Sequence, residues 1–171
     1  MKKTLLAISM LLITVALFSA TAAQANVWPI FIEKRDLIAG KYTTVGSVRV
    51  EYDGPSDSLI ITFETTDWKL YETHLYLGTA PPAKSAPGQF PYGHDPLPGV
   101  TSDPYTVPLT DLSADYGDTL YIAAHAVVCK CGCGCETAWA DGCHGFFNRA
   151  GRRQGWAMYG DIIGEEWPTL P

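Results

Sequence analysis

Hydrophobic and polar residues alternate along much of the chain, a pattern typical of β-strands with one buried face. The alternation predicts six strands, over residues 44–52, 59–63, 68–77, 120–128, 136–140 and 155–163. A turn-rich segment at 53–57 joins the first two strands into a hairpin. No segment after the N-terminal 25 residues shows a period of 3.6, apart from a turn or two at 150–154. The pattern therefore predicts an all-β domain.

The strand over 120–128 differs from the others, because its residues are apolar on both faces. This is typical of a central strand that is covered on both sides. Its side chains and those of the neighbouring strands supply the predicted core. That core comprises Leu59, Ile61, Phe63, Leu75, Leu77, Leu120, Ile122 and Trp156, each contributing about 1.5–3 kcal/mol when fully buried.

Residues 79–104 are rich in proline and glycine. Proline lacks a backbone donor, so this segment cannot form a central strand, and we expect a long ordered surface loop. Phe90, Tyr92 and Leu97 would pack that loop onto the sheet. Short strands with such a long crossing connection favour a two-sheet antiparallel sandwich of jelly-roll or immunoglobulin-like type.

The N-terminus combines a basic start, Lys2 and Lys3, with an apolar run over 4–20 and the small-residue pattern Ala-Gln-Ala at 23–25. This is the pattern of a secretory signal peptide, residues 1–25, followed by a single domain over 26–171. A transmembrane anchor is the alternative, but the run is barely long enough to span a bilayer and ends in a cleavage signal. We therefore expect a secreted or cell-surface protein with no membrane span after cleavage.

The net charge of the chain limits the classes of molecule that it is expected to bind. The formal net charge is −6, and loss of Lys2 and Lys3 with the signal peptide makes it more negative. An acidic surface repels phosphate backbones, which argues against nucleic-acid binding.

Cysteines are the densest chemical signal in the sequence. Cys129, Cys131, Cys133 and Cys135 alternate with other residues, and Cys143 is the fifth and last. In an oxidising compartment, a disulfide from Cys129 or Cys131 to Cys135 or Cys143 would staple a hairpin and leave an odd thiol for a second molecule. The alternative is a zinc or copper site of several thiolates, although zinc sites more often use Cys-x-x-Cys spacing.

A second group of polar residues lies on the predicted strands. Glu72 and His74 share one face, His125 interrupts an apolar strand, and Glu136 begins the next strand. If these strands are neighbours, the four side chains converge, and two imidazoles with a carboxylate suit zinc. We favour the alternative that they are buried groups bonded to one another, because no close His-x-His spacing supports metal ligation.

Sequence signatures of enzymes are absent: there is no Gly-x-Ser-x-Gly, His-Glu-x-x-His, phosphate-binding loop or EF-hand loop. A nucleophilic pair of Cys143 and His144 would require the two side chains to meet. Adjacent residues of a strand face opposite ways, so we expect no such pair and no catalytic residues.

Four sequence blocks resemble the recurring blocks of a group of exported bacterial all-β domains of no established activity. They are ETHLYLG at 72–78, PGQFPY at 87–92, AAHAVV at 123–128 and ETAWA at 136–140. The resemblance covers about Tyr42 to Asp161. The cysteine run lies between two of the blocks and looks like an insertion there. It implies an extracellular β domain and brings no catalytic residues.

These observations predict a secreted, non-catalytic module for binding or cell-surface assembly that carries a cysteine-rich hairpin loop. Covalent or non-covalent self-association is one expected mode of assembly. The alternative is an extracellular metal-handling protein that binds zinc or copper through the loop from Cys129 to Cys143, and a hydrolase is a distant third.

Overall fold

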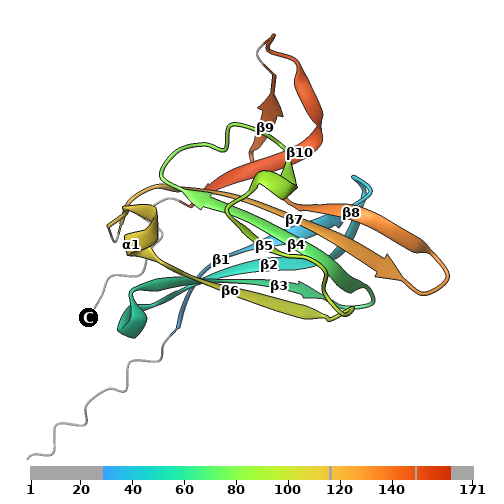
Figure 1. The fold of residues 1–171 in the computed structure, drawn as a ribbon, viewed down its shortest axis with the longest axis horizontal. Helices are drawn as coiled ribbons and strands as arrows, with labels where there is room; N and C mark the ends of the chain where they lie inside the picture. The colour runs from blue at the N-terminus through green and yellow to red at the C-terminus, as the bar shows by residue number, and fades with distance from the viewer. Residues whose placement is uncertain (1–28, 116, 149, 163–171) are drawn as a thin grey trace, which may run out of the picture.

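The structure is a computed structural model that describes residues 29–162 except Tyr116 and Arg149. Its strands are β1 (Ile30–Ala39), β2 (Thr43–Asp53), β3 (Ser58–Thr65), β4 (Lys69–Gly78), β5 (Tyr92–His94), β6 (Ser102–Pro108), β7 (Leu120–Lys130), β8 (Gly134–Ala140), β9 (His144–Phe147) and β10 (Arg153–Ile162). The helical elements are short: η1 (Gly54–Ser56), η2 (Pro87–Gln89) and α1 (Leu109–Leu112) (Figure 1). The expected signal peptide lies outside the described residues. Within them, no helix has the length and hydropathy needed to cross a membrane.

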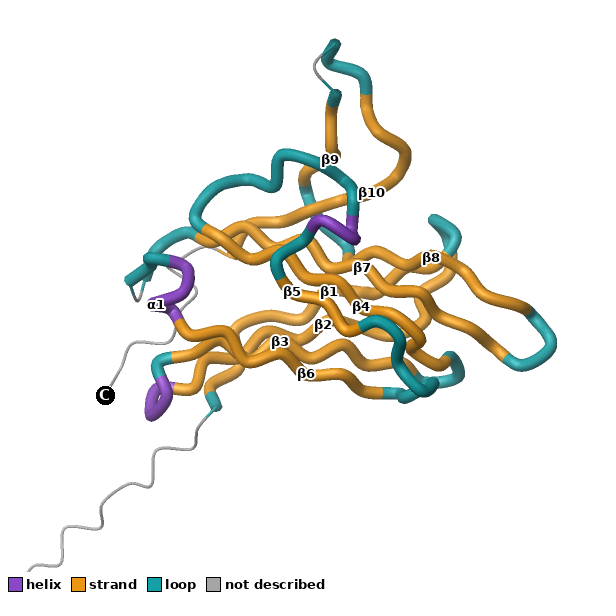
Figure 2. Tube along the Cα trace, in the orientation of Figure 1, coloured by secondary structure: helices purple, strands orange, loops and turns teal. Residues whose placement is uncertain are grey.

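The strands form an antiparallel sheet in the order β5-β4-β7-β8-β1-β2-β3-β6. The last strand, β10, pairs with β7 through residues 160–162 and with β9 through Arg153, Met158 and Tyr159. Strands dominate the trace in Figure 2, so the all-β prediction is confirmed. The central position predicted for 120–128 is also confirmed, because β7 pairs with β4, β8 and β10.

The sheet curls until its two ends meet. Leu70 of β4 donates its backbone N–H to the carbonyl of Val100 at 2.7 Å, and Leu97 donates to the carbonyl of Tyr71 at 2.7 Å. Thr65 at the end of β3 likewise donates to Thr101 at 2.9 Å. The segment before β6 is therefore bonded to β4, and the apolar face of the sheet is enclosed.

The finer prediction of a two-sheet sandwich is not confirmed, because one continuous order of pairing runs from β5 to β6. The single long proline-rich loop is not confirmed either. Residues 79–101 contain η2 and β5, and Pro104 and Pro108 belong to β6. Both β5 and β6 are end strands of the order, where a missing backbone donor is tolerated. The proline-rich segment thus supplies the two ends of the sheet that meet.

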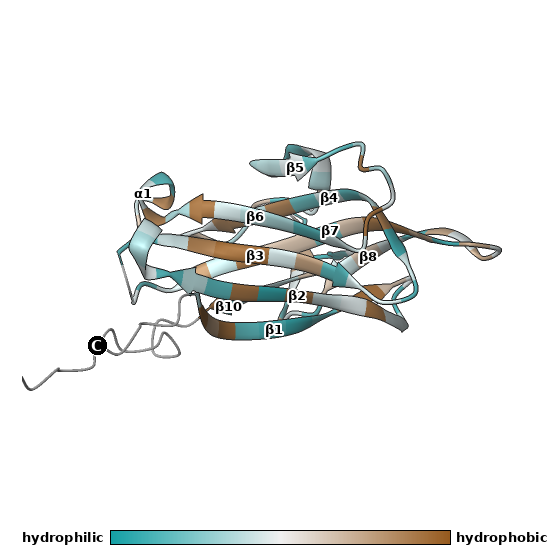
Figure 3. Cartoon of the chain, turned by 90° about the horizontal axis from the view of Figure 1, so that it is seen from below, coloured by the Kyte–Doolittle hydropathy of each residue, from teal (hydrophilic) through white to brown (hydrophobic). Residues whose placement is uncertain are grey.

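The main core fills the inside of the curl. Seven of the eight predicted core residues lie there with 3% exposure or less: Leu59, Ile61, Phe63, Leu75, Leu77, Leu120 and Ile122. Trp156 is only partly buried and packs elsewhere. Brown and teal residues alternate along several strands in Figure 3, as expected of strands with one buried face.

A second, smaller apolar cluster covers the opposite face of the sheet. Its buried members are Ala123, Trp139, Phe146 and Ala157, with Phe90, Tyr76, Trp156 and Tyr159 packed against them. Phe90 contacts Tyr76 and Trp139 edge to face, with ring centroids 6.0 and 6.1 Å apart. The proline-rich segment and the β9–β10 hairpin therefore meet over this face.

Two long strands were not predicted from the sequence. In β1, four consecutive charged residues at 33–36 hide the alternation, and register shifts interrupt its pairing with β2 twice. In β6, Asp103, Tyr105 and Val107 are buried and alternate with exposed neighbours. That period-two signal was present in the sequence, but the prolines concealed it.

Candidate functional site

The cysteine run forms the tip of the β7–β8 hairpin, which projects from one end of the molecule (Figure 1). Cys129 and Cys135 are opposite one another in the register and form a disulfide, with Cα atoms 4.0 Å apart. Cys131 and Cys133 lie in the turn beyond it, where both are exposed free cysteines. Glycines at 132 and 134 have φ values of +79° and +82°, which let the chain reverse there.

This geometry confirms one of the pairings that the sequence left open. A strand conformation through all four cysteines would place every sulfur on one face, but the turn at 131–133 separates them into two pairs. One pair closes the stem of the hairpin, and the other is presented to solvent. Cys143 is not part of this group.

An open hollow lies at the same end of the sheet as the hairpin. It has a volume of about 710 Å³, and Glu64, Asp67, Trp68 and Lys130 are among the residues that line it. Lys130 Nζ is 3.6 Å from Asp67 Oδ2. This mixed-charge hollow therefore extends to Lys130, the residue that directly precedes Cys131.

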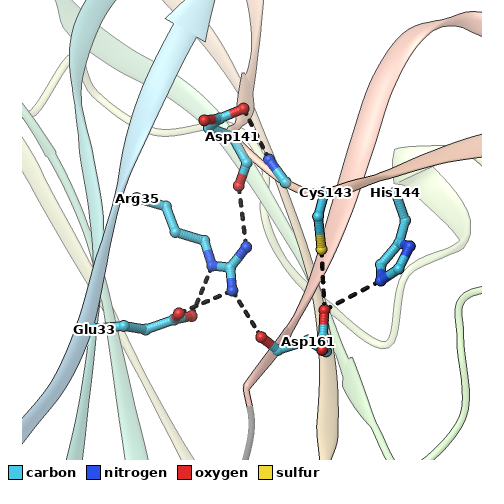
Figure 4. Close-up of polar contacts among 7 residues, drawn as sticks. Glu33, Arg35, Asp141, Cys143, His144 and Asp161 are labelled. Carbon is cyan, nitrogen blue, oxygen red and sulfur yellow. Dashed lines mark hydrogen bonds and ion pairs between the residues drawn. The ribbon is translucent and has the colours of Figure 1, made fainter. Parts of the chain in front are cut away.

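Cys143 belongs to a different cluster, at the base of the β9–β10 hairpin (Figure 4). Its Sγ donates to Asp161 Oδ1 at 3.0 Å, and His144 Nε2 lies 3.1 Å from the same oxygen. The expectation that Cys143 and His144 face apart is wrong, because Cys143 precedes β9 and the alternation of a strand does not apply to it. Gly142 makes this approach feasible: a Cβ there would lie 2.3 Å from the carbonyl oxygen of Tyr159.

The electrostatics of this cluster oppose a nucleophilic role for the thiol. The hydrogen bond to Asp161 is the main cause that raises the pKa of Cys143, with burial and the carboxylate charge adding to it. The same hydrogen bond is the main cause that lowers the pKa of Asp161. A nucleophilic cysteine needs a base that takes its proton and a lowered pKa, whereas here the carboxylate keeps the thiol protonated.

Arg35 of β1 anchors the backbone around this cluster. Its guanidinium donates to the carbonyl oxygens of Asp161 at 2.9 Å and Asp141 at 3.2 Å. Glu33 holds the guanidinium from the other side with two contacts of 2.7 and 2.8 Å. Gly160 leaves room for this side chain, since a Cβ there would lie 1.8 Å from Arg35 Nη1. Asp161 is therefore tied to β1 through its backbone.

The predicted cluster of Glu72, His74 and His125 forms on the face of the sheet opposite the main core. His74 and His125 are directly opposite in the register, with ring centroids 5.7 Å apart. Glu72 Oε2 is 3.6 Å from His74 Nε2. Asp95, which was not predicted, can also place a carboxylate oxygen within 4.8 Å of Glu72 and His74.

Glu136 does not join this cluster. It pairs with Val128 in the register, whereas Trp139 pairs with His125. Residues three apart on a strand face opposite ways, so Glu136 is on the other face from His125. Its carboxylate lies instead beside Gly40.

His125 is buried, with 7% of its surface exposed. Its ring centroid lies 5.0 Å from that of Trp139, and its Nδ1 has no hydrogen-bond partner among the residues that the structure describes. Burial, followed by the neighbouring His74, lowers the pKa of His125 to about 4. His125 is therefore neutral at physiological pH.

A further polar cluster closes the curl and was missed by the sequence analysis. Thr73 donates to Asp103 Oδ2, and the Tyr105 hydroxyl lies 2.7 Å from Thr73 Oγ1. His94 Nδ1 lies 2.9 and 3.0 Å from the two oxygens of Asp103, and its ring stacks on Tyr105 at 4.3 Å. Burial is the main cause that raises the pKa of Tyr105 to about 12. We call these four residues the seam cluster, because they join β4 and β5 to β6.

No protein-family model, curated protein or solved structure matches the chain.

Proposed function

We propose that this chain is a secreted, non-catalytic β module that binds or assembles with other molecules through the tip of its β7–β8 hairpin. The observation that carries the proposal is the division of the cysteine run. The Cys129–Cys135 disulfide closes the stem, and Cys131 and Cys133 remain exposed beyond it. A rigid stem with reactive groups at its end suits attachment to a partner.

Export supports this chemistry, because disulfides form and persist outside the cytosol. The resemblance to exported bacterial β domains and the predicted signal peptide belong to the same proposal. A tip thiolate attacks oxidised glutathione, which breaks the glutathione S–S bond, forms a mixed disulfide with the protein and releases one glutathione thiolate. The thiolate of a second chain can then attack the mixed disulfide, which links the two chains and releases the other glutathione.

One feature of the structure fits a surface that contacts a partner. The hollow lined by Glu64, Trp68 and Lys130 borders the tip and carries both charges and an aromatic ring.

The raised pKa of Cys143 argues against thiol catalysis at the other cysteine-bearing cluster. Metal handling through the hairpin, the alternative function, loses two of its thiols when Cys129 and Cys135 are oxidised.

Intact mass spectrometry of the exported protein tests the proposal, with and without thiol alkylation. We expect a chain that begins at Asn26 and contains one internal disulfide. Oxidised glutathione should convert Cys131 or Cys133 into a mixed disulfide or a covalent dimer. The double variant Cys131→Ser/Cys133→Ser should lose these products, and the matched control Cys143→Ser should retain them.

The proposal is overturned if the double variant forms as much of the covalent products as the unmodified protein, or if the unmodified protein forms none under this oxidant. It also fails if the exported fraction begins at Met1, because the signal peptide is then not removed.

A further inference from the structure

Cys143, His144 and Asp161 together offer one sulfur, one nitrogen and one oxygen donor. One ligand atom from each residue lies within 4.8 Å of the other two. Cys143 and His144 are exposed and Asp161 is partly exposed, so an ion can reach them from solvent. Glu33, Arg35 and Asp141 surround the cluster from the β1 side (Figure 4).

Two of the three donor separations in the cluster are close to those around a small tetrahedral ion, and the third, between the Cys143 sulfur and the His144 ring nitrogen, is within 4.8 Å. Zinc bonds of about 2.3 Å to sulfur and about 2.0 Å to nitrogen or oxygen imply donor separations of about 3.3–3.5 Å. The Sγ–Oδ1 and Nε2–Oδ1 distances are 3.0 and 3.1 Å. Side-chain rotations that separate each pair by a few tenths of an ångström would admit the ion.

The donors are held in place by groups that do not compete with a metal. His144 stacks on Tyr159 with ring centroids 5.0 Å apart. In Asp161, Arg35 bonds the backbone carbonyl oxygen and not the carboxylate, so the carboxylate is left to the cluster. Gly142 allows the close approach to β10 that brings Cys143 to Asp161. Such positioning lowers the cost of ordering the ligands when an ion binds.

The chemistry of the donor set selects the metal. Calcium and magnesium take oxygen ligands, and copper(I) favours sulfur from cysteine and methionine. Thiolate, imidazole and carboxylate are all ordinary zinc ligands, and three of them leave the fourth position to water or a ligand. A cavity of about 370 Å³, lined by Cys143, His144, Arg153 and Tyr159 among others, provides space beside that position.

We propose that Cys143, His144 and Asp161 form a zinc site with three protein ligands and one open position. On binding, the ion replaces the thiol proton, which leaves to solvent, and the Asp161 carboxylate turns from the thiol to the metal. The site lies on the β9–β10 side and uses neither tip thiol. It therefore stands independently of the proposed function of the β7–β8 hairpin.

Cobalt(II) titration tests the site, because cobalt takes zinc positions and reports its ligands by absorption. The exported protein, with Cys129–Cys135 oxidised, is freed of metal with a chelator and titrated anaerobically. We expect one cobalt ion per chain, visible bands of tetrahedral intensity and a near-ultraviolet sulfur-to-cobalt band, all removed by added zinc. Cys143→Ser should lose the sulfur band, and His144→Gln and Asp161→Asn should each weaken binding by about tenfold or more.

The double variant Cys131→Ser/Cys133→Ser is the matched control, and it should keep the stoichiometry and the sulfur band. If the control loses the band and Cys143→Ser keeps it, the metal binds at the hairpin tip and the proposal is wrong. It is also wrong if no sulfur band develops, or if alkylation shows that Cys143 is already in a disulfide. Circular dichroism of each variant shows whether the fold is retained, and His144→Gln, which changes an exposed side chain, keeps the test decisive if Cys143→Ser does not fold.

Discussion

His125 is the most buried of the four histidines, and its charge is set by that burial. Desolvation and the neighbouring imidazole of His74 hold its pKa near 4, well below that of an unfolded histidine, about 6.5. In the unfolded chain His125 therefore takes up a proton at a higher pH than in the folded chain. Because the unfolded state binds more protons between these two pH values, stability falls as the pH falls.

We predict that His125 removes up to about 3 kcal/mol from the free energy of unfolding between pH 6.5 and pH 4. Well above pH 6.5, from about pH 7.5, its contribution is constant, because the imidazole is then neutral in both states. The variant His125→Gln should show a shallower loss over this range, measured by urea unfolding at a series of pH values. His144→Gln, which changes an exposed histidine, is the control, and equal slopes for His125→Gln and the unmodified protein would contradict the prediction.

At the scale of elements, single side chains connect strands that are distant in the sequence. Arg35 of β1 bonds the carbonyl oxygens of Asp141 and Asp161, which lie more than a hundred residues along the chain. Only 14% of the Arg35 side chain is exposed, and its guanidinium is paired with Glu33. The β9–β10 hairpin is thus attached to β1 as well as to β7.

We predict that Arg35→Met lowers the free energy of unfolding by about 1–3 kcal/mol, because two carbonyl oxygens and the Glu33 carboxylate lose their donors. Chemical denaturation measures this loss. Lys34→Met, at the exposed neighbouring position of β1, is the matched control and should change stability by no more than about 0.5 kcal/mol. A loss of equal size in both variants would show that the hydrogen bonds of Arg35 do not matter.

At the scale of the whole molecule, the enclosure of the core depends on the seam cluster. Thr73 is fully buried and bonds both Asp103 and Tyr105. These residues come from strands that are not neighbours in the order of the sheet. The seam cluster therefore stabilises the curl itself and not a local pair of strands.

We predict that Thr73→Val lowers the free energy of unfolding by about 1–3 kcal/mol, because the variant removes the hydroxyl that bonds the buried Asp103 and Tyr105. Asp103 keeps its contact with His94, and the Tyr105 hydroxyl keeps its bond to the backbone carbonyl of residue 73. The side chain keeps its shape, so packing changes little. Thr106→Val, on the exposed face of β6, should stay within about 0.5 kcal/mol of the unmodified protein. Hydrogen exchange should also show faster opening of β6 in Thr73→Val, and unchanged exchange there would count against the role of the seam.

Local patterns were sufficient for much of the fold. Alternation and turn residues predicted β2, β3, β4, β7, β8 and the described part of β10, because a half-buried strand requires period-two hydrophobicity. They failed for β1, where four charged residues stand in a row, and for β6, where prolines mask a clear alternation. The apolar composition of β7 was enough to place it centrally, since it must be covered on both faces.

The candidate sites divide in the same way. The sequence of a single strand was enough to predict that Glu72 and His74 share one face. The spacing of the cysteines and the expected oxidising compartment were enough to predict a disulfide that closes the stem of a hairpin. Asp95 and Asp161 could not be predicted as partners, because only the pairing of distant strands brings them to His74 and Cys143. Glu136 was wrongly grouped with His125, because the face of a residue depends on the register between two strands and not on its own strand.

The sequence by itself determined the class of the fold, most strands, the expectation of export and the cysteine hairpin, since each depends on composition or on neighbours along the chain. Only the tertiary structure decided that one sheet curls on itself, that Thr73, His94, Asp103 and Tyr105 close it, and that Cys143 separates from the other cysteines to join His144 and Asp161. The physical reason is that these contacts depend on strand order, on register and on the close backbone approach at Gly142. None of these is encoded in a local pattern of residues.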